Sequence, residues 1–122
     1  MSLGGIAMSD YHTVKKDDYL FKEGDFPDCM YIVRSGQFSI FITEGHLEKE
    51  LSLVGPGNLI GELALFDKKN RSASARATTD SSVVKLPYAQ LEKQMESLPE
   101  WVRITMKTLS EKLRITNKKL FG

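Results

Sequence analysis

The chain has 122 residues, of which 41% are hydrophobic and 27% are charged, and these values fit one folded domain and exclude wholesale disorder. Its 17 basic and 16 acidic residues leave a net charge of +1, which excludes a strongly basic nucleic-acid coat. The single cysteine, Cys29, excludes an internal disulfide and a cysteine-rich zinc site. No apolar run approaches the ~18 residues of a membrane span, and no secretory signal pattern is present, so we predict a cytoplasmic protein.

Residues 11–86 predict a series of short strands. Apolar runs such as Tyr19–Phe21 and Met30–Val33 are each followed by turn residues, and residues 38–42 show the two-residue period of a half-buried strand. Short strands at regular spacing are typical of a sandwich, jelly roll or barrel. We therefore predict a mainly β fold, an antiparallel β-roll or jelly roll of about eight strands.

After Pro87 the pattern becomes helical. Residues 88–97 contain no glycine, and Pro87 and Pro99 stand where the first turn of a helix tolerates proline. We predict two helices over about 87–121, which complete a domain of residues 11–122. Residues 1–10 form an N-terminal segment, and its opening is compatible with residues left by expression cloning.

The second helix carries an apolar seam with steps of three and four residues, which is the a/d spacing of a coiled coil. Its members are Val102, Met106, Leu109, Leu113, Thr116 and Leu120. Two interpretations stay open: the helix packs on its own β unit, or the seam joins two chains in a homodimer. We favour the dimer, with Trp101, Ile104 and Ile115 facing the β unit. The basic residues of the helix, Arg114 among them, are expected on a solvated face.

The segment of residues 58–77 contains the side chains best suited to chemistry. Glu62 lies among apolar residues, where a carboxylate is costly unless it is satisfied. Arg71, after a short loop, offers a planar fork that suits phosphate, and the small residues Ser72 and Ala73 permit close backbone approach. If residues 62–65 begin a short helix, its N–H groups add an anion seat. Either this is a pocket for a sugar phosphate, or Glu62 and Arg71 form a buried ion pair without a ligand.

The sequence Gly61-Glu62-Leu63-Ala64-Leu65, followed by Arg71-Ser72-Ala73, resembles the phosphate-binding cassette of cyclic nucleotide-binding domains. The frame around it is also similar, in residues 20–25, 30–33 and 55–57. The resemblance covers about residues 14–120. It implies a β-roll that binds a cyclic nucleotide, most simply cAMP, with cGMP as the other candidate, and that signals through its C-terminal helices.

The resemblance implies a role for each cassette position. Glu62 should accept a hydrogen bond from the ribose 2′-hydroxyl, and Arg71 should pair with the cyclic phosphate. The backbone N–H groups of Ala64 and Ser72 should complete the phosphate seat. Gly61 should let the chain turn tightly into the short helix.

The other expected site residues are apolar walls and base contacts. The wall residues are Ile40, Leu51, Val54 and Ile60, and Leu63 and Ala73 belong to the cassette itself. Thr116 and Asn117 fall where one branch of the family contacts adenine across a dimer. Asn117 departs from the serine that is usual there.

We expect a sensor and not an enzyme, because nothing offers a nucleophile, a metal cluster or a partner base for hydrolysis. We expect no cofactor and no metal, and no binding to nucleic acid or membrane by this chain alone. Three alternatives stay open. The chain is a regulator of the same fold that responds to another ligand or partner, the sensor half of a transcription factor, or an enzyme that uses Glu62 as an acid or base.

Overall fold

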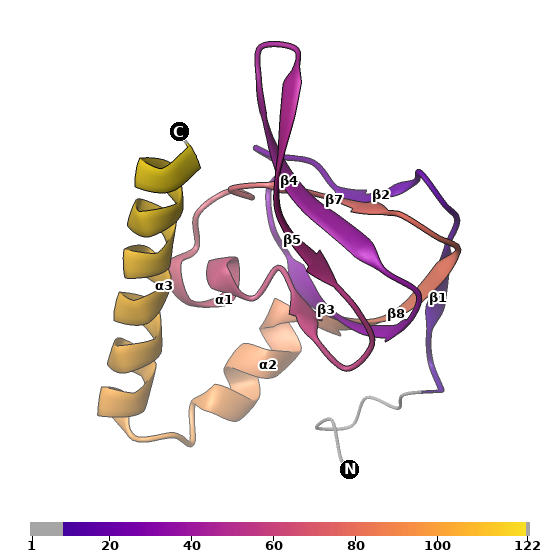
Figure 1. Cartoon of the computed structure of the whole chain (residues 1–122). Coiled ribbons are helices and arrows are strands. Elements are labelled where there is room, and N and C mark those ends of the chain that lie inside the picture. The colour runs from indigo at the N-terminus through magenta and orange to yellow at the C-terminus, as the bar shows by residue number, and fades with distance from the viewer. Residues whose placement is uncertain (1–8, 122) are drawn as a thin grey trace.

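The computed structural model describes the backbone of residues 9–121 and the side chains of residues 9–116. Over this range eight strands form two four-stranded antiparallel sheets that face each other (Figure 1). The first sheet has the order β1 (His12–Val14), β8 (Ser81–Pro87), β3 (Cys29–Ser35) and β6 (Leu59–Ile60). The second has the order β2 (Tyr19–Phe21), β7 (Ser74–Ala77), β4 (Phe38–Glu44) and β5 (Leu47–Val54). The predicted eight-stranded β-roll is confirmed, while most of the N-terminal segment lies outside the described residues.

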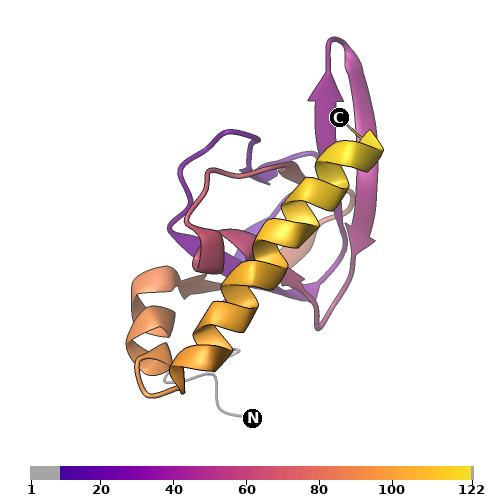
Figure 2. The same ribbon diagram turned by 90° about the vertical axis from the view of Figure 1, so that its left-hand side faces the viewer.

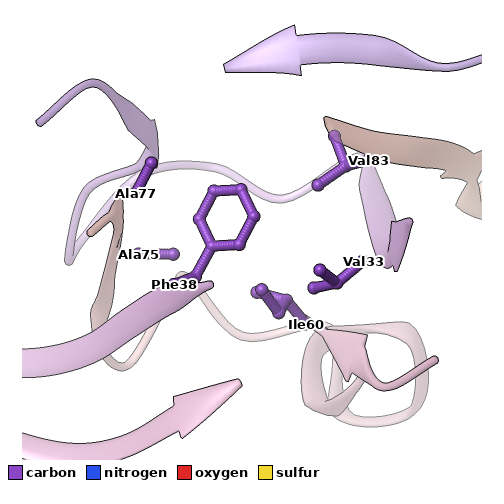
Figure 3. Packing of buried hydrophobic residues seen from close by; sticks show 6 residues of the cluster. All are labelled: Val33, Phe38, Ile60, Ala75, Ala77 and Val83. Carbon is purple, nitrogen blue, oxygen red and sulfur yellow. The ribbon is translucent and has the colours of Figure 1, made fainter. Parts of the chain in front are cut away.

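The core fills the space between the two sheets. Its fully buried members are Val33, Phe38, Ile60, Ala75, Ala77 and Val83. The Phe38 ring points from β4 into the centre of this cluster, beside the short side chains of the neighbouring strand β7 (Figure 3). Alanines on β7 therefore leave the volume that a phenylalanine on β4 occupies.

The strand alternation predicted for residues 38–42 is present, and both faces of β4 are buried. Phe38 and Ile40 pack on the core between the sheets. The pairing of β4 with β5 shifts register between Ile40 and Phe41, but the extra residue, Leu51, lies on β5, while β4 pairs with β7 without a shift. Phe41 therefore points away from the core side of β4, and it is 2% exposed with its ring edge-on to Tyr19.

The described residues also form three helices. α1 (Leu63–Asp67) joins β6 to β7, α2 (Tyr88–Met95) follows β8, and α3 (Glu100–Phe121) runs along the side of the sandwich (Figures 1 and 2). The expected short helix in the cassette and the two C-terminal helices are thus present, and Pro87 is the extended residue that caps α2. Within residues 9–121, no helix combines the length and apolarity needed to cross a membrane.

The prediction of which α3 residues face the β unit is wrong. Trp101, Ile104 and Ile115 are 69%, 56% and 56% exposed, whereas Ser110 is buried and the Arg114 side chain contacts Asp67 of α1. The reason is chemical: α1 and the loop after it present a carboxylate and backbone carbonyls to α3, and such acceptors need hydrogen-bond donors.

The apolar seam of α3 is not covered by its own β unit. Leu109 and Leu113 are 54% and 52% exposed, and Met106 is 39% exposed. The interpretation in which α3 packs on its own chain is confirmed in part, because α3 packs on α1, but Leu109 and Leu113 of the seam do not take part in that packing. Leu120, the last seam residue, has a side chain outside the described residues.

Candidate ligand-binding site

A cavity of about 290 Å³ opens between α1, the β4–β5 hairpin and α3. Around it the structure gathers every predicted cassette residue, namely Gly61, Glu62, Leu63, Ala64, Arg71, Ser72 and Ala73, and every predicted wall residue, namely Ile40, Leu51, Val54 and Ile60. Four further residues complete the lining: Phe21, Ser52, Leu59 and Arg114. Apolar walls with a few convergent polar groups are typical of a small-molecule site.

Gly61 turns the chain from β6 into α1. Its φ of +82° lies in the region that L residues rarely adopt. Glu62 caps α1 without a hydrogen bond from its side chain to the helix, and no described residue forms a hydrogen bond or ion pair with its carboxylate. Ala64 and Leu65 pack against Tyr88 of α2, so α1 is held in place while the Glu62 carboxylate stays available to the cavity.

Arg71 is buried beside this turn, with 6% of its surface exposed. Its Nη1 donates to the carbonyl of Gly61 and to the hydroxyl of Tyr88, both at 3.1 Å. Its Nη2 donates to the carbonyl of Cys29 at 2.5 Å, and the ring of Phe21 lies 4.1 Å from the guanidinium carbon. The Nε atom is buried without a partner. Every partner of the guanidinium is thus uncharged.

The alternative of a buried Glu62–Arg71 ion pair is wrong, since no ion pair of the described residues joins the two. Nor do the two side chains that accept hydrogen bonds from the guanidinium, Cys29 and Tyr88, supply a negative charge. Burial raises the pKa of the Cys29 thiol and of the Tyr88 phenol, so both stay neutral near pH 7. A buried cation without a counter-ion is costly, and the Arg71 guanidinium faces a cavity that is large enough to admit an anion.

The expected base contacts on α3 are not part of this cavity. Thr116 is exposed and does not line it, and the side chain of Asn117 lies outside the described residues. Arg114 lines the cavity instead, although the sequence places it among residues expected on a solvated face. The available signal was weak: Ser110 and Arg114 are four residues apart and therefore share a helix face next to the seam.

No group of three or more histidine, cysteine or acidic side chains within the described part of the chain is arranged to hold a metal ion. His12 and His46 are both exposed.

Replacing Gly61 with alanine should destabilise the fold by about 1–2 kcal/mol, because the turn keeps φ positive at this position and a residue with a Cβ is unfavourable there. The same Cβ would collide with Nη1 of Arg71, so the guanidinium must move. Chemical denaturation measures the stability change. Gly55→Ala is the matched control, since a Cβ there meets nothing within 4 Å and φ is not positive. Equal stability of the two variants would contradict the role given to Gly61.

Comparison with known proteins agrees with this geometry. The family model of the cyclic nucleotide-binding domain matches residues 11–97. The chain is 43% identical over 68 residues to the cyclic AMP receptor protein of Thermus thermophilus, covering 55% of this chain and 32% of that protein. It is 31% identical over 102 residues to the transcriptional activator protein Anr of Pseudomonas protegens, covering 83% of this chain and 41% of Anr.

A solved structure of the EAL enzyme Bd1971 in its cAMP-bound form is similar over 90% of this chain and 29% of that one. The TM-score is 0.86 at 34% sequence identity, and the cGMP-bound form of the same enzyme gives 0.80. The chain thus spans less than half the length of these relatives. Because the family model covers most of the chain and its cassette residues line one cavity, the chain belongs to the family of cyclic nucleotide-binding domains.

Proposed function

We propose that this domain binds cAMP in the cavity beside Arg71 and acts as a regulatory sensor. The observation that carries the proposal is the buried Arg71 guanidinium, which has an unpaired Nε and no carboxylate partner. A cyclic phosphate carries one negative charge and acceptor oxygens, which are what this guanidinium lacks. Charge-assisted hydrogen bonds of this kind are about twice as strong as neutral ones.

The other cassette groups complete the phosphate and ribose contacts. The N–H groups of Ala64 and Ser72 donate to phosphate oxygens. Ala64 lies in the first turn of α1, which leaves N–H groups without helical partners, and Ser72 directly follows Arg71. The Glu62 carboxylate, which no described side chain engages, accepts from the ribose 2′-hydroxyl. Gly61 keeps the backbone close enough for both contacts.

The apolar walls hold the remainder of the nucleotide. Ile40, Leu51, Val54 and Ile60 line the cavity with apolar side chains, and their burial by a ribose or purine removes apolar surface from water. The similarity to Bd1971, solved with cAMP and also with cGMP, supports a cyclic purine nucleotide.

Titration calorimetry of the chain with cAMP, cGMP and 5′-AMP tests the proposal. We expect one cAMP per chain, weaker cGMP binding and little or no binding of 5′-AMP, whose dianionic open phosphate does not match the seat. Absence of binding by both cyclic nucleotides would overturn the proposed function and favour a regulator of the same fold with another ligand.

Glu62→Gln should weaken cAMP binding by about 1.5–3 kcal/mol, because the amide keeps the shape but loses a charge-assisted hydrogen bond. The wild-type protein should bind 2′-deoxy-cAMP less tightly than cAMP, whereas the variant should discriminate much less. Calorimetric titrations of both nucleotides against both proteins measure this. If the wild-type protein binds the two nucleotides equally, Glu62 does not contact the ribose hydroxyl.

We further propose that two chains pair through the α3 seam and that ligand binding repositions the C-terminal helices. Exposure of Leu109 and Leu113 in the single chain supports a partner helix at this face. Thr116 and Asn117 then contact the base from the partner chain. The similarity to Anr, which is named a transcriptional activator, makes the sensor half of a transcription factor the second candidate.

The proposed role is binding without chemistry on the nucleotide. Arg71 and its uncharged partners can hold a phosphate, but they offer no nucleophile for hydrolysis. Incubation with cAMP, followed by chromatography for 5′-AMP, tests this role, because turnover would make Glu62 a catalytic acid or base. A cytoplasmic location stays a prediction from the sequence.

A further inference from the structure

Arg114 of α3 grips the end of α1 and the loop that follows it. Its Nε and Nη2 form a two-pronged ion pair with the carboxylate of Asp67, in which Nη2 lies 3.1 Å from Oδ1. Its Nη1 donates to the carbonyl of Asn70 at 3.1 Å, and Nη2 also approaches the carbonyl of Lys69 at 3.4 Å. All three guanidinium nitrogens therefore bind residues 67–70, the end of α1 and the loop after it.

This contact is buried and cannot be replaced by water at low cost. The side chains of Arg114 and Asp67 are 12% and 0% exposed. The only other donor that the structure gives the Asp67 carboxylate, within the described residues, is the N–H of Lys69 at 3.1 Å. Removing one partner of a buried ion pair leaves an uncompensated charge, which is strongly unfavourable.

The gripped loop leads directly to the phosphate-binding arginine. Residues 67–70 precede Arg71 without a break, and Arg114 itself lines the cavity. α1 lies between α3 and the sandwich (Figure 1), and α1 is the element on which α3 packs. A displacement of α3 must therefore move the loop before Arg71 or break the ion pair.

We propose that Arg114 is a positioning residue that couples occupancy of the cavity to the docking of α3, an inference that rests on the proposed function. Docked α3 supplies one wall of the cavity through Arg114, so a nucleotide favours the docked position. Coupling is reciprocal, so docking of α3 strengthens nucleotide binding by the same factor.

The contacts of Arg114 with residues 67–70 are called the clamp below. Distance measurements between two spin labels, made without and with cAMP, test whether the clamp holds α3 in its docked position. Labels are placed at Lys85→Cys on β8 and Thr108→Cys on α3, both exposed positions, while native Cys29, 1% exposed, stays unlabelled. Labelled protein is diluted with unlabelled protein so that only distances within one chain are measured. Circular dichroism checks that each variant is folded.

In the wild-type protein we expect a distance distribution with one main peak, and we expect cAMP to make that peak narrower. In Arg114→Gln we expect a broad distribution in both states and about tenfold weaker cAMP binding, within the range of measured couplings. Lys107→Gln is the matched control, because it removes an exposed charge from the same helix and should change neither readout. The double variant Asp67→Asn/Arg114→Gln leaves no buried charge, and it should behave like Arg114→Gln even if the single variant fails to fold.

The outcomes separate the clamp from the proposed function. If the wild-type protein binds neither cyclic nucleotide, the proposed function fails, while the nucleotide-free distances still test the clamp. A narrow distance distribution in both the single and the double variant would overturn the clamp. A broad distribution with unchanged cAMP affinity would overturn the coupling.

Discussion

Replacing Arg71 with alanine is expected to lower cAMP affinity about 30-fold to a few thousand-fold, a loss of about 2–5 kcal/mol. The variant leaves the cyclic phosphate without its counter-ion in a buried site. The fold should persist, because the Tyr88 hydroxyl still donates to the Gly61 carbonyl when the guanidinium is gone. Titration calorimetry measures the affinity, and thermal unfolding without ligand should remain cooperative.

Arg76 provides the control for this experiment. Its guanidinium makes a two-pronged ion pair with Glu48 at 2.7 and 2.9 Å and does not line the cavity. Arg76→Ala removes the same kind of side chain from the neighbouring region of the sheet, so cAMP affinity should stay at the wild-type value. If Arg71→Ala also binds like the wild-type protein, Arg71 is not the phosphate ligand.

The double substitution Leu109→Asp/Leu113→Asp is expected to convert the proposed dimer into monomers. It places carboxylates of like charge along an apolar seam, opposite the same residues of the partner chain. Sedimentation velocity with and without cAMP measures the change. In the wild-type protein, cAMP should strengthen the dimer, because Thr116 and Asn117 of one chain then contact the nucleotide of the other.

Ile115→Asp is the control for the seam. Ile115 is 56% exposed and lies on a different face of α3, so the charge should leave the dimer intact. If the wild-type protein stays monomeric with cAMP bound, the proposal that two chains pair through the α3 seam is wrong. α3 would then act on the cavity of its own chain.

Local sequence signals were sufficient for the elements, and the family resemblance identified eleven of the lining residues, but Phe21, Ser52, Leu59 and Arg114 were not predicted. Turn residues and short apolar runs mark strands because strand and turn preferences act over a few residues. Gly61, Glu62 and Arg71 stand in one segment, joined by the short helix α1, so their spacing along the chain already implies that they meet. The register shift after Ile40 was not predictable, because it depends on the pairing of β4 with β5 and not on residues 38–42 alone.

The sequence by itself therefore determined the β-roll, the cassette and the apolar seam of α3. Only the tertiary structure decided what each charged side chain meets. Arg71 meets carbonyls of Cys29 and Gly61 and the Tyr88 hydroxyl, and Arg114 meets Asp67 across 47 positions of sequence. Such partners come from elements far apart in the chain, and the free energy of a buried charge depends on the groups that folding brings around it. The order of these groups along the sequence does not show which of them lie close together in the folded chain.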